Sequence, residues 1–119
     1  MYSITTNSSQ SLVELTFSGP MDQDPAAFFK ELTGSADRVR RSTGSWQLLV
    51  DFTETDVMVQ ERAQNTGKIF EWCLANGISK TAIVASSATQ KMQIRRVTNA
   101  SKLIEFFDTA AQAQAWLKR

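Results

Sequence analysis

Apolar and polar residues alternate along two short segments at the start of the chain, and this period of two is typical of half-buried strands. The segments are MYSITT (1–6) and SLVELTFSG (11–19), and in the second one Val13, Leu15 and Phe17 share a face. The four residues between them, NSSQ, favour a turn. The pattern therefore predicts a β-hairpin.

A first helix is predicted within 21–41, where apolar residues recur at helical spacing. Asp24 is the expected N-cap, and Pro25 occupies the first helical position, where proline is tolerated. At Gly34 the helix is expected to shorten or to divide in two. The inward stripe consists of Phe28, Leu32, Ala36 and Val39.

A second helix is predicted to start at Thr55 or Asp56, either of which can serve as the N-cap, and to end near Ala75. Gly77 then occupies the left-handed position beyond the last turn. The inward stripe of this helix is expected to contain Val59, Ala63, Ile69 or Phe70, and Cys73 or Leu74.

Two further helices follow later in the chain. One covers 89–100 and has Lys91, Arg95 and Arg96 opposite an inward face of Met92 or Ile94 with Val97. The last is capped by Asp108 or Thr109. Its inward residues, spaced i, i+3 and i+4, are Ala113, Trp116 and Leu117.

Three apolar runs, at 46–52, 80–86 and 102–108, predict further strands and complete the order ββαβαβαβα. This alternation predicts an α/β fold with a mixed, mostly parallel five-stranded sheet, one antiparallel strand near an edge and about four helices. The apolar character of the runs supports parallel pairing, because parallel strands are usually covered on both faces. With no repeat or linker in the sequence, 1–119 is expected to form a single domain.

The composition excludes several classes of function. The sequence has no histidine, which excludes Ser-His-Asp and Cys-His catalysis and zinc bound by histidine. The single cysteine, Cys73, cannot form an intrachain disulfide and is expected to be a small buried hydrophobe. A net charge of +1 gives no reason to expect nucleic acid. Short apolar runs and the lack of an export signal predict a cytoplasmic protein without membrane insertion.

The order of elements resembles that of the SpoIIAA-like, or STAS-like, family of small bacterial domains. The segments that carry the resemblance are LLVDFTETD (48–56), KTAIVAS (80–86) and IEFFDTAAQAQAWL (104–117). The similarity is one of pattern and covers essentially the whole chain, including the closing AQAWL at 113–117. It implies a β-α superhelix and, for the best understood relatives, a role as anti-sigma-factor antagonists.

Those relatives are switched by phosphorylation of a serine at the N-terminus of the helix after the third strand, where a helix accommodates an anion. Asp51 matches the family's strand-ending acid, and Thr53 stands where a small polar residue is common. The serine position falls within 59–61, which reads Val-Gln-Glu and cannot accept a phosphate. The resemblance is therefore closer to an uncharacterised branch without the switch, and Thr53 and Thr55 are the hydroxyls left at the junction.

Four carboxylates, Asp51, Glu54, Asp56 and Glu61, follow the central strand at the end of the sheet where ligands of open α/β folds bind. One interpretation is a site for a hard cation such as Mg²⁺. The other is structural: Asp56 caps the helix, Glu61 lies near its positive end, and Asp51 and Glu54 accept hydrogen bonds from loop N–H groups. We favour the structural interpretation and predict neither a metal nor a cofactor.

Two other places are candidates for binding. Lys91 and Arg95, spaced i and i+4, share one face of their helix and form either a site for an anion or acidic partner or a solvated face. The side chains of Ile69, Phe70 and Trp72 together cover nearly half of the helix circumference. The three cannot all face inward, so one large apolar group is expected at the surface. Trp72 is the candidate for contact with a partner.

With no catalytic residue set, the sequence predicts a non-enzymatic STAS-like module that binds another protein, with a homodimer as an alternative. A rival prediction is a small-molecule or lipid-binding domain, because lipid carriers of the CRAL-TRIO type also use a β-α superhelix. A chain of 119 residues leaves little material to enclose an acyl chain. A metal-assisted hydrolase at Asp51, Glu54 and Asp56 is the third alternative.

Overall fold

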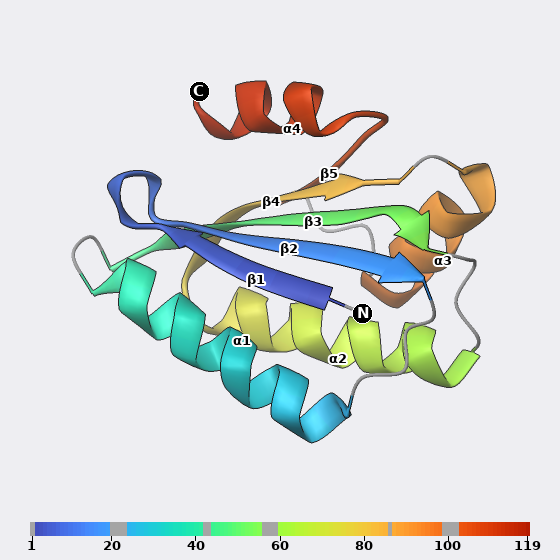
Figure 1. Ribbon diagram of the computed structural model, residues 1–119, viewed down its shortest axis with the longest axis horizontal. Helices are drawn as coiled ribbons and strands as arrows, with labels where there is room; N and C mark the ends of the chain where they lie inside the picture. The colour runs from blue at the N-terminus through green and yellow to red at the C-terminus, as the bar shows by residue number, and fades with distance from the viewer. Residues whose placement is uncertain (1, 20–23, 42–43, 56–59, 86, 99–102) are drawn as a thin grey trace.

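The computed structural model of the protein describes residues 2–19, 24–41, 44–55, 60–85, 87–98 and 103–119, apart from the side chains of 60–63 and 97–98. These residues form a five-stranded sheet with helices on both faces (Figure 1). The strands are β1 (Tyr2–Asn7), β2 (Leu12–Gly19), β3 (Trp46–Thr55), β4 (Ile78–Val84) and β5 (Ile104–Phe107). The helices are α1 (Pro25–Arg40), α2 (Gln60–Ala75), α3 (Ala88–Thr98) and α4 (Ala110–Leu117).

The strands lie in the sheet in the order in which they occur in the chain, β1-β2-β3-β4-β5. β1 pairs antiparallel with β2, and all later neighbours pair parallel. The antiparallel strand thus forms one edge of the sheet and β5 forms the other. This arrangement confirms the predicted α/β fold and its mostly parallel sheet.

The helices divide unequally between the two faces of the sheet. α1, α2 and α3 lie together on one face, whereas α4 lies alone on the other (Figure 1). The larger core lies beneath the three helices and includes Val13, Leu48, Val50, Phe52, Leu32, Phe70 and Ile94. The smaller core beneath α4 includes Leu12, Leu49, Val84, Ala113 and Leu117.

α1 begins as the sequence predicts. A side-chain oxygen of Asp24 accepts a hydrogen bond from the N–H of Ala26 at 3.4 Å, and Pro25 is the first helical residue. The helix continues through Gly34, so the expected interruption does not occur. Burial of the whole predicted stripe outweighs the roughly 1 kcal/mol cost of a glycine within a helix.

α2 begins later than the sequence predicts. Thr55, one of the two expected N-caps, is instead the last residue of β3, because its pairing with Gly19 of β2 keeps the backbone extended. The other expected N-cap, Asp56, and the stripe residue Val59 lie outside the described residues. The helix includes Ala63, whose side chain is also outside the description.

The described part of the α2 stripe resolves the alternatives that the sequence left open. Phe70 and Cys73 are buried, Ile69 is partly buried, and Leu74 is 38% exposed. Phe70 and Cys73 are therefore the core positions. Beyond the helix, Gly77 has a φ of +86°, which is the left-handed conformation expected there.

The later elements keep their predicted order with shifted ends. On α3, Ile94 is buried and Met92 is 59% exposed, so Ile94 is the inward residue. Thr109 is the N-cap of α4, and its hydroxyl accepts a hydrogen bond from the N–H of Gln112 at 3.2 Å. Among the helices of the described chain, none combines the length and apolar character that crossing a membrane requires.

Replacement of two glycines by alanine is expected to change stability in opposite directions. Gly77→Ala should lower the free energy of unfolding by about 1–2 kcal/mol, because a Cβ there stands 3.2 Å from the Gly44 carbonyl oxygen on a left-handed backbone. Gly34→Ala should raise it by about 0.5–1 kcal/mol, because a Cβ there meets nothing within 4 Å. Urea unfolding of both variants measures the two changes. Equal effects would contradict the backbone assignment at Gly77.

Candidate functional site

The polar groups at the end of β3 are hydrogen-bonded to one another. Asp51 Oδ1 accepts hydrogen bonds from the backbone N–H of Thr53 at 2.9 Å and from its hydroxyl at 2.7 Å. The Asp51 carboxylate thus fixes the backbone at the point where β3 departs from regular pairing. A phosphate on Thr53 would replace this bond and set two negative groups side by side.

A register shift follows Asp51. Asp51 pairs with Thr16 of β2, but the next pair joins Glu54 with Ser18, so β3 contains one extra residue. Residues that pair across parallel strands share a face, and Thr16 and Ser18 lie on the face that carries α4. The bulge therefore brings Asp51 and Glu54 to the same face of the sheet, which alternation along an unbroken strand would not do.

Of the four acids of the predicted cation site, the structure describes the side chains of two, Asp51 and Glu54. In the described part of the chain, no three acidic, histidine or cysteine side chains gather closely enough to hold a metal ion. Asp56 lies outside the described residues, and Glu61 is in the first turn of α2 with its side chain undescribed. The structural role of Asp51 is supported by its two hydrogen bonds, and the cation site has no support from the described acids.

Gln90, which the sequence pattern did not single out, connects the end of β3 to α3. The side chain is 4% exposed, and its Nε2 donates to the carbonyl oxygens of Phe52 at 3.3 Å and Thr55 at 2.9 Å. Its own N–H donates to the hydroxyl of Ser87 at 3.0 Å. The spacing Ser87-x-x-Gln90 is that of a capping box, and this signal is visible in the sequence.

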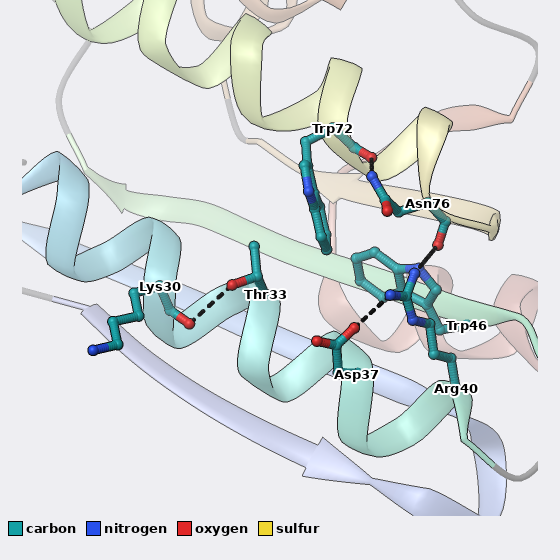
Figure 2. Close-up of polar contacts among 7 residues, drawn as sticks. All are labelled: Lys30, Thr33, Asp37, Arg40, Trp46, Trp72 and Asn76. Carbon is teal, nitrogen blue, oxygen red and sulfur yellow. Dashed lines mark hydrogen bonds and ion pairs between the residues drawn. The ribbon is translucent and has the colours of Figure 1, made fainter.

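Trp72 lies within a cluster that joins α1, β3 and α2 (Figure 2). Its ring packs edge-on to Phe29, with centroids 5.6 Å apart, and tilted against Trp46 at 6.2 Å. The carbonyl oxygen of Asn76 accepts hydrogen bonds from Arg40 Nη1 at 2.7 Å and from Trp46 Nε1 at 3.0 Å. Trp72 is therefore half-buried between helices instead of standing free at the surface, and its contact with a partner stays a prediction.

Lys91 and Arg95 share a face of α3, as predicted, and that face lies against β5. Lys91 Nζ pairs with Asp108 Oδ1 at 2.6 Å, and the Arg95 guanidinium stands 4.8 Å from the centroid of the Phe106 ring. An anion at Lys91 would have to compete with Asp108. Both side chains therefore fix α3 to the edge of the sheet.

An open groove of about 620 Å³ lies along β5, between α3 and α4. Its lining includes Lys91, Phe106, Phe107 and Trp116. The rings of Phe107 and Trp116 pack against each other with centroids 5.6 Å apart. The groove thus combines an edge strand with aromatic and charged side chains.

A second, apolar cavity of about 40 Å³ lies between the sheet and the helices α1 and α2. The residues around it include Phe17, Phe28, Phe52 and Phe70, with Asn65 and Thr66 as its polar members. This volume holds no more than a few water-sized groups, whereas sites for small molecules usually measure about 300–1,000 Å³.

Comparison with known proteins identifies the fold. No protein-family description and no curated protein sequence matches the chain. Its structure is similar to the crystal structure of an uncharacterised protein of the DUF3478 family from Shewanella loihica PV-4, which has a SpoIIAA-like fold. The two are 18% identical over 98% of this chain and 93% of the other, with a TM-score of 0.66. The chain has a SpoIIAA-like fold.

A second solved structure with the same arrangement is the NMR structure of the protein TM1081. It is 14% identical to this chain, covers 99% of it and 87% of its own length, and gives a TM-score of 0.63. Both similarities extend over nearly the whole SpoIIAA-like chain and agree with the resemblance in the sequence. A fold of this kind supports many functions, so function has to be argued from the sites.

Replacing Gln90 by methionine is expected to lower the free energy of unfolding by about 1–3 kcal/mol. The change keeps the size of the side chain but leaves the Phe52 and Thr55 carbonyl oxygens without their Nε2 donor. Gln64→Met, at an exposed position of α2, is the matched control and should stay within about 0.5 kcal/mol. Equal stability of the two variants in urea would show that Gln90 does not hold β3 to α3.

Cys73 gives the protein a pH-dependent stability at alkaline pH. Burial raises the pKa of its thiol from 9.0 to about 12, so the folded state favours the protonated form. The contribution of the protonated Cys73 thiol to the free energy of unfolding is fully present below pH 9, and it is lost as the pH rises from about 9 towards 12. The stability difference between the wild type and Cys73→Ala should narrow by about 1.4 kcal/mol per pH unit in that range. A difference independent of pH would contradict the burial of the thiol.

Proposed function

We propose that this SpoIIAA-like protein is a non-enzymatic module of the cytoplasm that binds another protein. The polar groups described at the carboxyl end of β3 support a structural role, because Asp51, Thr53 and Thr55 are hydrogen-bonded within the chain. The composition supports the same conclusion, since the sequence contains no histidine for acid-base or nucleophilic catalysis.

The observation that carries the proposal is the exposure of two large apolar side chains, one on α3 and one just before β5. Met92 on α3 is 59% exposed, and Leu103, which directly precedes β5, is 40% exposed. The groove along β5 adds the aromatic residues Phe106, Phe107 and Trp116. Apolar and aromatic groups beside polar ones are the usual components of a protein-binding surface.

The alternative of a small-molecule or lipid-binding domain is favoured by the apolar cavity between α1 and α2. Its volume of about 40 Å³ is far below that of an acyl chain, so binding would require α1 and α2 to separate. The aromatic packing of Phe29 against Trp72 joins these helices and opposes that movement. Native mass spectrometry of gently purified protein distinguishes the alternatives, since a stoichiometric bound small molecule would support ligand binding.

Affinity capture from the native host is expected to enrich a protein partner over a tag-only control. The aspartate introduced by Met92→Asp should reduce this enrichment, because it places a charge within an apolar contact. Leu74→Asp introduces the same charge at an apolar residue of α2 that is 38% exposed and should leave the enrichment unchanged. Quantitative mass spectrometry of the three captures gives the comparison.

The proposal fails if no protein is enriched and the chain sediments as a monomer at high concentration. A concentration-dependent homodimer that Met92→Asp dissociates would identify the partner as a second copy. Enrichment that responds equally to Met92→Asp and Leu74→Asp would place the binding surface elsewhere.

A further inference from the structure

β5 is an edge strand, and in the described chain no strand lies beside its outer side. The carbonyl oxygens of Leu103 and Phe107 accept hydrogen bonds from N–H groups on the β4 side at 2.7 and 3.1 Å. The backbone groups of a strand alternate between its two sides, so those of Ile104 and Phe106 point away from β4. Two N–H and two C=O groups are thus available to an added strand.

The groove borders the β5 edge on both faces of the sheet, and the open part of the edge is short. Trp116 of α4 and Lys91 of α3 line it on opposite faces of the sheet. Just beyond β5, the N–H of Asp108 donates to Oε1 of Gln112 at 3.3 Å and is already occupied. The open backbone is therefore restricted to the four residues of β5, which suits a short extended segment.

Two basic side chains, Lys91 and Arg119, and two acidic ones, Glu105 and Asp108, line the groove, whereas the helices beside it add only basic charges. Neither α3 nor the segment from α4 to the last residue contains an acid. The basic residues of these segments are Lys91, Arg95, Arg96, Lys118 and Arg119. Of the two acids that line the groove, Asp108 forms an ion pair with Lys91. The other acid is Glu105 on β5. An occupant that carries acidic residues is the electrostatic complement of this surface.

A second copy of the same edge fits less well. If two β5 strands paired antiparallel about Glu105, the two Glu105 carboxylates would stand opposite each other, where like charges are destabilising. The basic residues of both α3 helices would also flank the same junction. Both effects favour an acidic partner of a different sequence.

We infer that the edge of β5 binds an extended acidic segment of a partner protein as an additional strand. The inference rests on the proposed protein-binding function and specifies the chemistry of the partner. Backbone hydrogen bonds to Ile104 and Phe106 supply affinity, and the basic residues of α3 supply the preference for acidic side chains.

Two synthetic peptides test the inference. One alternates valine with aspartate, the other alternates valine with lysine, and both are blocked at the ends and carry fluorescein. Fluorescence anisotropy should show at least about tenfold tighter binding of the aspartate peptide. The double variant Arg95→Glu with Arg96→Glu should weaken this binding by about fivefold or more. Arg38→Glu with Arg41→Glu makes the same change of charge at the C-terminal end of α1 and should alter the binding less than about twofold.

Amide signals in NMR locate the peptide. On addition of the aspartate peptide, the amides of Ile104 and Phe106 should shift and become protected from hydrogen exchange, whereas those on the β4 side stay as they were. Equal affinity for the two peptides, equal effects of the two double variants, or protection confined to other segments would overturn the inference.

The inference and the proposed function can fail separately. A partner captured from the host while the aspartate peptide leaves β5 unprotected would refute strand addition and leave protein binding intact. If, without peptide, the protection of Ile104 and Phe106 rises with protein concentration, the segment that binds β5 is a second copy of the chain and not an acidic partner.

Discussion

The crossovers between the parallel strands β2 to β5 all return over the same face of the sheet, and most other features depend on this constraint. Parallel strands need long connections, and these are almost always right-handed. With strands placed in chain order, right-handed connections put α1, α2 and α3 on one face. The opposite face is left to α4 and to the polar residues at the ends of β2 and β3.

The same constraint leaves β5, the last strand, with none of the described strands on its outer side. Among the described residues, β5 pairs with β4 alone, and α4 turns back over the sheet instead of continuing it. α3 is held to this edge by Lys91 and Arg95, so the edge has a helix on each side and an open backbone between them. Exposed edges usually carry protective features, and here the charged Glu105 opposes pairing of the strand with itself.

Local signals in the sequence account for most of the fold. Alternation at Val13, Leu15 and Phe17 predicted the hairpin, helical spacing predicted the α1 stripe, and Asp24 and Thr109 are caps as expected. Such features depend on a few neighbouring residues, so one sequence suffices to predict them. The fold class followed because alternating strands and helices permit few topologies.

Features that depend on distant residues were not predictable in the same way. The bulge after Asp51 is set by the register between β2 and β3, which no local pattern specifies. Thr55 is extended because β2 pairs with it, and Trp72 is half-buried because Phe29 and Trp46, from other elements, pack against it. The acidic junction suggested chemistry, whereas Asp51 serves the local backbone. The groove along β5 emerges only when three elements meet.

Amide hydrogen exchange of the isolated protein measures directly whether the outer edge of β5 is open. Glu105 and Phe107 direct their N–H groups towards β4, whereas Ile104 and Phe106 direct theirs outward. We expect slow exchange at Glu105 and Phe107 and fast exchange at Ile104 and Phe106. Equal protection at all four residues would mean that the outer edge of β5 is covered and cannot accept an added strand.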